Sequence, residues 1–136
     1  MADYYTRFSV VLQLDATQKE YALDLANKAE SHRNEDEPLP SDFPADLKDV
    51  LEEWSFETEK DEEGLWLNSE NGGIDAVCAF IQHLLQKFDP QGRVSFEWAN
   101  DCSKPLTDAY GGGAAVITAK EIKVMSTYEW LQSQGV

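Results

Sequence analysis

The sequence predicts an α+β domain of the ferredoxin-like class, in which a β-α-β-β-α-β order builds an antiparallel-rich sheet with helices on one face. Several segments alternate between apolar and polar residues, as strands with one buried face do. Two longer segments carry apolar residues at helical spacing. These segments follow one another in the split β-α-β order, and an extra strand and helix are expected after them.

The chain begins with a predicted strand and helix. Residues 4–14 alternate and are rich in aromatic and β-branched side chains, so they predict a strand. Thr17 and Glu20 have the spacing of a capping box, in which each side chain satisfies a free backbone N–H. A helix is therefore expected over about residues 18–31, with a stripe of small alanines suited to close packing on the sheet.

The middle of the chain is predicted to be less regular. Three prolines within residues 32–44 indicate a loop. Apolar residues at helical spacing then predict one short helix from about Ala45 to Trp54. Two strands are expected over residues 54–60 and 65–69, joined by a turn in which Gly64 can take the positive φ that such turns commonly need.

The last half of the chain starts with the clearest helix, over residues 74–88, which Asp89-Pro90 ends. A strand is expected over residues 93–99, followed by a long connection to Tyr110. Gly111-Gly112-Gly113 opens a final strand that is expected to continue toward Val124. Ser126 and Glu129 have the capping-box spacing, which predicts a terminal helix that includes Trp130 and Leu131.

Negative charge is concentrated in residues 30–75, named here the acidic segment. It holds sixteen of the 26 acidic residues and three of the 11 basic ones, which leaves −13 of the net charge of −15. The residues before and after it are each close to neutral. Such a run is commonly a solvated face, and it is also suited to binding a basic partner.

Length and charge exclude several classes of protein. The 136 residues predict one domain over 1–136, and 42% hydrophobic residues are enough for a core. A net charge of −15 argues against direct binding of nucleic acid or of an anionic membrane, because both require Lys and Arg. No secretion signal is recognised, so Cys78 and Cys102 are expected to be free thiols in the cytoplasm.

Few residues have the spacing that catalysis or metal binding requires. His32 and His83 have no second ligand at zinc spacing, so no metal or other cofactor is expected. The triple glycine leads into a strand, which favours close backbone approach over a phosphate-binding loop. A second hypothesis, a small-ligand or enzymatic domain, places a pocket beside the 100–113 loop. Its candidate residues are Cys102, Lys104, Asp108 and Tyr110.

The last third of the chain resembles small uncharacterised acidic proteins encoded by phages and plasmids. The resemblance lies in Phe96-Glu97-Trp98, in Cys102-Ser103-Lys104-Pro105 and in the triple glycine, and it continues in the segment 126–131. That group implies no activity and no functional residue for this chain. Inhibitors from mobile elements, including mimics of DNA, are often small and acidic. This chain resembles them in size and charge and shares no motif with them.

The leading hypothesis is a non-enzymatic binding protein. Carboxylates of the acidic segment would imitate a row of phosphates and occupy the basic surface of a nucleic-acid-binding protein. A third hypothesis is a structural or assembly role, with a dimer formed through an exposed strand. The residues predicted to bind the partner are Asp46, Asp49, Glu52, Glu53, Glu57, Glu59, Asp61, Glu62 and Glu63.

Overall fold

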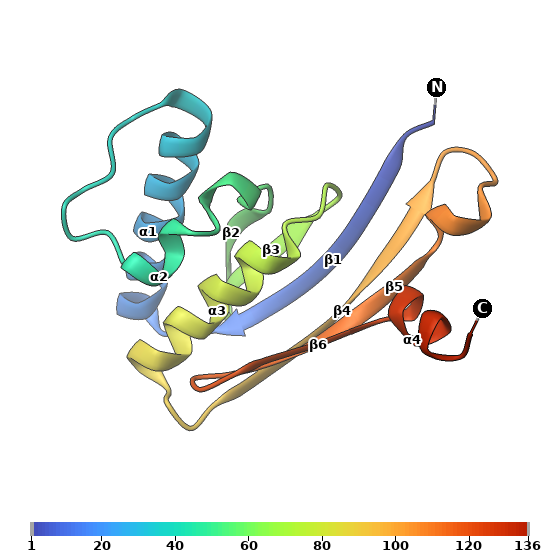
Figure 1. Cartoon of the computed structure of the whole chain (residues 1–136). Helices are drawn as coiled ribbons and strands as arrows, with labels where there is room; N and C mark the ends of the chain where they lie inside the picture. The colour runs from blue at the N-terminus through green and yellow to red at the C-terminus, as the bar shows by residue number, and fades with distance from the viewer. Residues whose placement is uncertain (1, 136) are drawn as a thin grey trace.

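The computed structural model describes residues 2–135 as an α+β fold. One six-stranded sheet has the order β2-β3-β1-β4-β5-β6, and every neighbouring pair of strands is antiparallel (Figure 1). The strands are β1 Tyr4–Gln13, β2 Glu57–Asp61, β3 Gly64–Ser69, β4 Arg93–Cys102, β5 Gly111–Thr118 and β6 Ile122–Ser126. The helices of the described part are α1 Ala16–Glu35, α2 Ala45–Lys48, α3 Ile74–Phe88 and α4 Thr127–Ser133, with 3₁₀ turns η1 Leu51–Glu53 and η2 Thr107–Ala109.

Strand β1 lies at the centre of the sheet and changes partner along its length. Its first half, up to Phe8, pairs with the end of β4, and its second half, from Phe8 on, pairs with β3. The ladder between β1 and β4 ends where Phe8 faces Trp98. Beyond that point β1 and β4 each pair on one side only, so the sheet opens between them.

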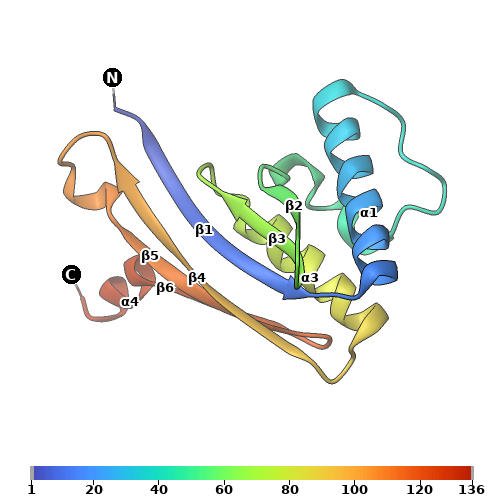
Figure 2. The same ribbon diagram turned by 180° about the vertical axis from the view of Figure 1, so that it is seen from behind.

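One hydrophobic core lies between the helices and one face of the sheet. Helices α1 and α3 share this core with β1 and β3, where Leu12 faces Leu65. Trp54, Phe56 and Phe80 form its aromatic centre, with ring centroids 4.8 to 5.8 Å apart. The opposite face of β1 is exposed, and Figure 2 shows this side with α3 behind the strands.

The start of α1 differs from the prediction. The N-cap is Asp15, and the capping box joins Asp15 and Gln18 in place of Thr17 and Glu20. The Gln18 backbone N–H donates to Asp15 Oδ1 at 2.8 Å, and the Asp15 N–H donates to Gln18 Oε1 at 3.1 Å. Both pairs have the same spacing, and Asp is the stronger N-cap, so the helix begins earlier. It also runs further, to Glu35.

The predicted short helix of the middle segment is wrong in one respect. It splits into α2 and η1 because Val50, with φ −111° and ψ 7°, is not helical. The side chains of Leu47, Leu51 and Trp54 are nevertheless buried, as their spacing indicated. These three side chains pack the segment against the core.

The positive φ predicted for Gly64 is also wrong. Gly64 is the first residue of β3, and the turn before it is made by Glu62 and Glu63. A Cβ at Gly64 would overlap the backbone carbonyl of Leu12 on β1. The glycine therefore permits close approach of two strands, which is a different reason from the one that the sequence indicated.

The far half of the sheet extends beyond the helices as an arm, made of residues 3–6, residues 100–113 and α4 (Figure 1). Strand β4 is longer than predicted and ends at Cys102. Strands β5 and β6 form a hairpin at the sheet edge. The predicted cap of the terminal helix is confirmed, because Ser126 Oγ accepts from the Glu129 N–H at 3.1 Å.

Candidate functional site

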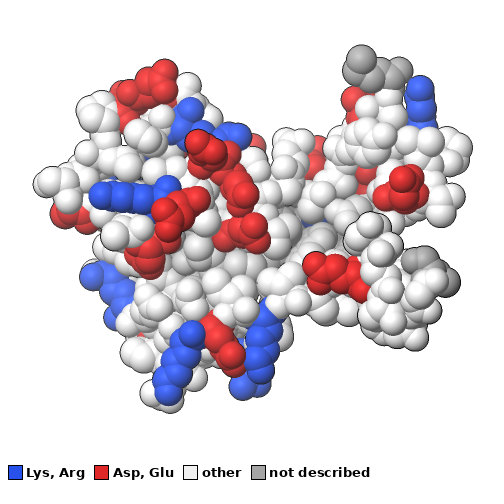
Figure 3. All heavy atoms as spheres, viewed as in Figure 1, with Lys and Arg blue, Asp and Glu red and all other residues white. Residues whose placement is uncertain are grey.

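The acidic segment passes from the end of α1 through α2 and η1 to β2 and β3. Of the nine residues predicted to bind a partner, Asp61 is half-buried and the other eight are exposed. The structure therefore presents their carboxylates to solvent. Figure 3 shows Asp and Glu gathered over the helical end of the molecule, with Lys and Arg atoms between them.

Basic side chains do not neutralise these nine carboxylates within residues 2–135. The only ion pair that involves any of them there joins Asp46 to His83. Arg33 lies within the acidic segment, but its Nε donates to the backbone carbonyl of Glu52 at 3.0 Å. Lys19 Nζ likewise donates to the backbone carbonyl of Asp61, at 2.9 Å. Arg33 and Lys19 thus bind the backbone and leave these carboxylates exposed.

The nine residues surround one end of the sheet and do not share one plane. The four in or beside α2 and η1 lie on the helix side, because these turns pack on α3. Glu57 and Glu59 belong to β2 and are in register with Asn68 and Trp66, on the face that the helices leave bare. Glu62 and Glu63 form the turn between β2 and β3. We name this set of nine residues the acidic surface.

Like charges meet where α1 passes β2. Burial raises the pKa of Glu30 on α1, and the negative charge of Glu57 on β2 raises it further. Keeping the Glu30 carboxylate charged at neutral pH therefore costs the folded state free energy, mainly because it is partly buried and to a smaller extent because Glu57 is near.

A chain of hydrogen bonds that the sequence did not reveal ties three helices together. The Tyr21 hydroxyl of α1 lies 2.7 Å from His83 Nε2 of α3, and His83 Nδ1 lies 3.2 Å from Asp46 Oδ2 of α2. Lys87 lies over the Tyr21 ring, with its Nζ 4.7 Å from the centroid. The chain holds α2, and with it part of the acidic surface, against α1 and α3.

This chain resembles a hydroxyl–histidine–carboxylate triad, but its chemistry is structural. Burial raises the pKa of Tyr21, and the charges of Asp46 and Asp42 raise it further against the opposing effect of Lys28. The phenol thus stays protonated, and the imidazole tautomer of His83 sets which group donates in its contacts with Tyr21 and Asp46. A nucleophile needs the opposite shift. His32 has a structural contact too, 2.7 Å from the carbonyl of Glu37 at the end of α1.

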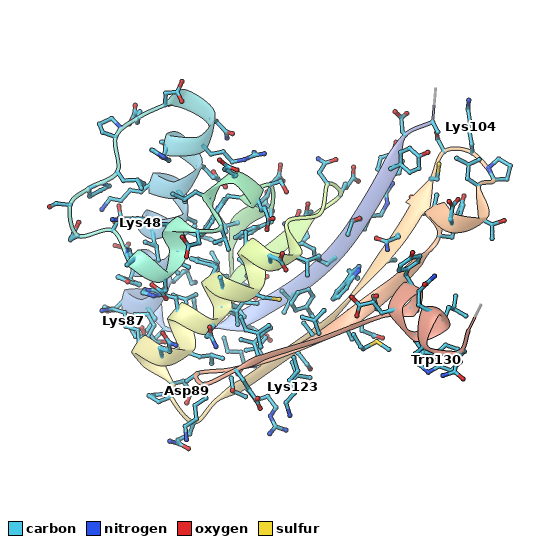
Figure 4. All side chains as sticks on the ribbon, in the orientation of Figure 1. Lys48, Lys87, Asp89, Lys104, Lys123 and Trp130 are labelled. Atoms are coloured by element: carbon cyan, nitrogen blue, oxygen red, sulfur yellow. The ribbon has the colours of Figure 1, made fainter. Side chains whose placement is uncertain are left out.

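The residues of the alternative ligand site lie in the arm and converge only in part. Cys102 is buried, and its sulfur accepts from the Lys104 backbone N–H at 3.5 Å. The Tyr110 hydroxyl donates to the Cys102 carbonyl at 2.8 Å. Asp108 is exposed in η2, and the Lys104 side chain lies at the tip of the arm (Figure 4). The hydrogen bonds of Cys102 with Lys104 and Tyr110 stabilise the loop itself.

Cys78 and the triple glycine have structural roles. Burial, with a smaller effect of Asp75, raises the pKa of the Cys78 thiol to about 12, so the reactive thiolate does not form near neutral pH. Gly113 faces Trp98 across the β4–β5 pair, and a Cβ there would overlap the indole ring. A Cβ at Gly112 would overlap the backbone carbonyl of Trp98, so the close backbone approach that the glycines were predicted to permit is confirmed there.

One cavity lies where β1 and β4 diverge, and α3 forms its floor. It has a volume of about 590 Å³, and Val11, Leu84, Phe88 and Arg93 are among the residues that line it. A shallower hollow of about 520 Å³ lies between η1 and the start of α3, lined in part by Arg33, Glu52 and Glu53. Neither is lined by the four residues of the alternative ligand site.

Comparisons with family models, with curated proteins and with solved structures found no match to the chain. Within residues 2–135, no group of three or more His, Cys, Asp and Glu side chains is placed to hold a metal ion. The helices of the same range include none of the length and apolar character needed to cross a membrane.

Proposed function

We propose that the protein is a non-enzymatic binding protein whose acidic surface occupies the basic surface of a nucleic-acid-binding protein. The observation that carries the proposal is the set of carboxylates at the β2 end that are exposed and unpaired with Lys or Arg across residues 2–135. Like charges gathered on one surface repel one another and oppose folding, and a binding role accounts for their presence.

The physical basis is imitation of a phosphate backbone. Duplex DNA carries one charge per about 1.7 Å of its axis, and a protein that binds it is built to contact charge at that density. Carboxylates on both sides of β2 and on the turn after it offer a rounded negative surface to such a groove. Long-range attraction would speed the encounter, and salt would weaken it.

The fold proposed to hold this surface is ferredoxin-like. The order β2-β3-β1-β4, with α1 after β1 and α3 after β3, supports that assignment. Strands β5 and β6 and helix α4 would then be additions at one edge of the sheet, away from the acidic surface. Two buried free cysteines are in keeping with the cytoplasm as the site of action.

The test compares two variants of equal net charge. One carries Glu52→Lys, Glu59→Lys and Glu62→Lys, whose carboxylates make no hydrogen bond that the structure records in residues 2–135. The control carries Asp89→Lys, Glu97→Lys and Asp108→Lys, which are exposed and outside the acidic segment. Each triple change raises the net charge from −15 to about −9, because each substitution adds two units.

The readout is capture of a partner from a lysate of the natural host at low salt, with release by high salt. The first variant should lose the partner that the wild type captures, and the control variant should keep it. Equal loss in both variants would mean that net charge alone matters. Retention by the first variant, with its fold intact by circular dichroism, would refute the acidic surface as the binding site.

A further inference from the structure

The two edges of the sheet are protected very differently. Strand β2 has charged residues at four of its five positions, and α1 lies against it, with Lys19 bound to the Asp61 carbonyl. Such charges and cover are the usual means by which edge strands avoid pairing. Strand β6, at the other edge, has Lys123 as its only charged residue. Ile122, Val124 and Met125 are 37%, 48% and 50% exposed.

The backbone of β6 offers a regular row of free hydrogen-bonding groups. The Thr118 N–H donates to the Glu121 carbonyl at 2.9 Å, and the register continues with Lys123 facing Val116. Alternate residues of an antiparallel strand bond to opposite sides. Lys123 and Met125 therefore bond to β5, whereas Ile122 and Val124 direct their N–H and C=O groups to the open edge. Ser126 directs its N–H there, but its carbonyl belongs to α4 as the N-cap.

Helix α4 continues from β6 and lacks a core of its own. It has seven residues, and none of them is buried. Three of these residues are large and apolar, yet Tyr128, Trp130 and Leu131 are 66%, 57% and 47% exposed. Figure 4 shows Trp130 on this helix at the end of the arm. A helix so short is marginal by itself and gains stability from packing. Helix α4 thus exposes apolar side chains at the end of β6, where it contacts both β5 and β6.

Charge identifies the occupant of this edge. Residues 119–135 carry Lys120, Lys123, Glu121 and Glu129, so this end of the molecule is neutral although the chain has a net charge of −15. It offers no attraction to a basic partner. Five strand spacings of about 4.8 Å separate it from β2, or about 24 Å against a Debye length of about 8 Å. A second copy can dock here while its own acidic surface stays distant.

We propose that the protein forms a symmetric dimer by antiparallel pairing of β6 with β6 of a second copy, giving one continuous twelve-stranded sheet. The register with the greatest overlap of the outward-bonding residues has Val124 facing its own counterpart and Ile122 facing Ser126 of the second copy. A stable dimer buries about 1,200–2,000 Å² in total. A five-residue strand pair does not supply this alone, so the exposed apolar residues of α4 complete the contact.

Sedimentation velocity of the wild type over a range of concentrations tests the proposal. The expected species has twice the monomer mass of 15.3 kDa. It should persist at high salt, since apolar and backbone contacts hold it. Val124→Lys should weaken self-association by about tenfold or more, because two ammonium groups would face each other. The matched control is Val11→Lys, at a position 42% exposed on the bare face of β1, which should dimerise as the wild type does.

A cross-linking variant decides the outcome if Val124→Lys fails to fold. Facing residues of a bonded antiparallel pair have Cα atoms about 5.5 Å apart, within the range of a disulfide. Val124→Cys should therefore give disulfide-linked pairs under mild oxidation, and Val11→Cys should not. A wild type that stays monomeric at hundreds of micromolar, a folded Val124→Lys dimer, or no cross-link at Val124→Cys would each overturn the proposal. A monomer that still binds a basic partner leaves the proposed function standing.

Discussion

Tyr21→Phe removes one hydroxyl from the chain that joins α1, α3 and α2. The ring itself stays, so its T-shaped contact with Phe88 and its contact with Lys87 are kept. What is lost is the 2.7 Å hydrogen bond to His83. A hydrogen bond of this kind contributes about 1 kcal/mol net. At about 2.1 cal/mol/K of unfolding entropy per residue, that loss lowers the Tm of a chain of this length by about 3–4 °C.

Urea unfolding followed by circular dichroism measures this change at pH 7.5. The matched control is Tyr128→Phe, at a tyrosine 66% exposed on α4, where we expect no change beyond about 0.5 kcal/mol. A Tyr21→Phe protein as stable as the wild type would show that the hydrogen bond to His83 contributes nothing. The reasoning that α2 is held in place by this chain would then be wrong.

The same pair of proteins gives a test by pH. Because burial and nearby carboxylates raise the pKa of Tyr21 above its ordinary value of 10.0, the unfolded tyrosine ionises first as pH rises. The contribution of Tyr21 to stability is thus complete below pH 10 and falls above it. The difference between the wild type and Tyr21→Phe should shrink above pH 10. A difference that is constant or grows would contradict the raised pKa.

Two further changes test the packing of the arm and the repulsion between acids. Gly113→Ala should destabilise the protein by about 1–3 kcal/mol, because its Cβ overlaps Trp98 and the Met125 carbonyl; a variant as stable as the wild type in urea would argue against that packing. Glu30→Gln should stabilise the protein at pH 7.5, and the gain should disappear as pH falls below about 4.5, where Glu30 is protonated in both states. The control is the exposed Glu20→Gln on the same helix, and an equal effect there would exclude the Glu30–Glu57 repulsion as the cause.

Much of the fold follows from local patterns in the sequence. Alternation along β1 and helical spacing along α3 identify these elements because each has one buried face. The bounds of α3 agree with the prediction over residues 74–88. The start of α1 is harder to predict, since Asp15 and Thr17 offer competing caps of the same spacing.

The parts that the sequence did not reveal depend on tertiary contacts. Tyr21 counted as an apolar-stripe residue and His83 as a polar surface residue, yet they form a hydrogen bond across 62 positions. The openness of β6 and the cover over β2 likewise depend on strand order, which periodicity does not contain. The acidic residues were evident from composition, but their placement around both sides of β2 was not.

Capture of a partner at low salt by the two charge-matched triple variants tests the central claim most directly. We expect the variant at Glu52, Glu59 and Glu62 to capture nothing, and the variant at Asp89, Glu97 and Asp108 to capture what the wild type does. If the first variant, folded, retains the partner, then the carboxylates around β2 do not form the binding site.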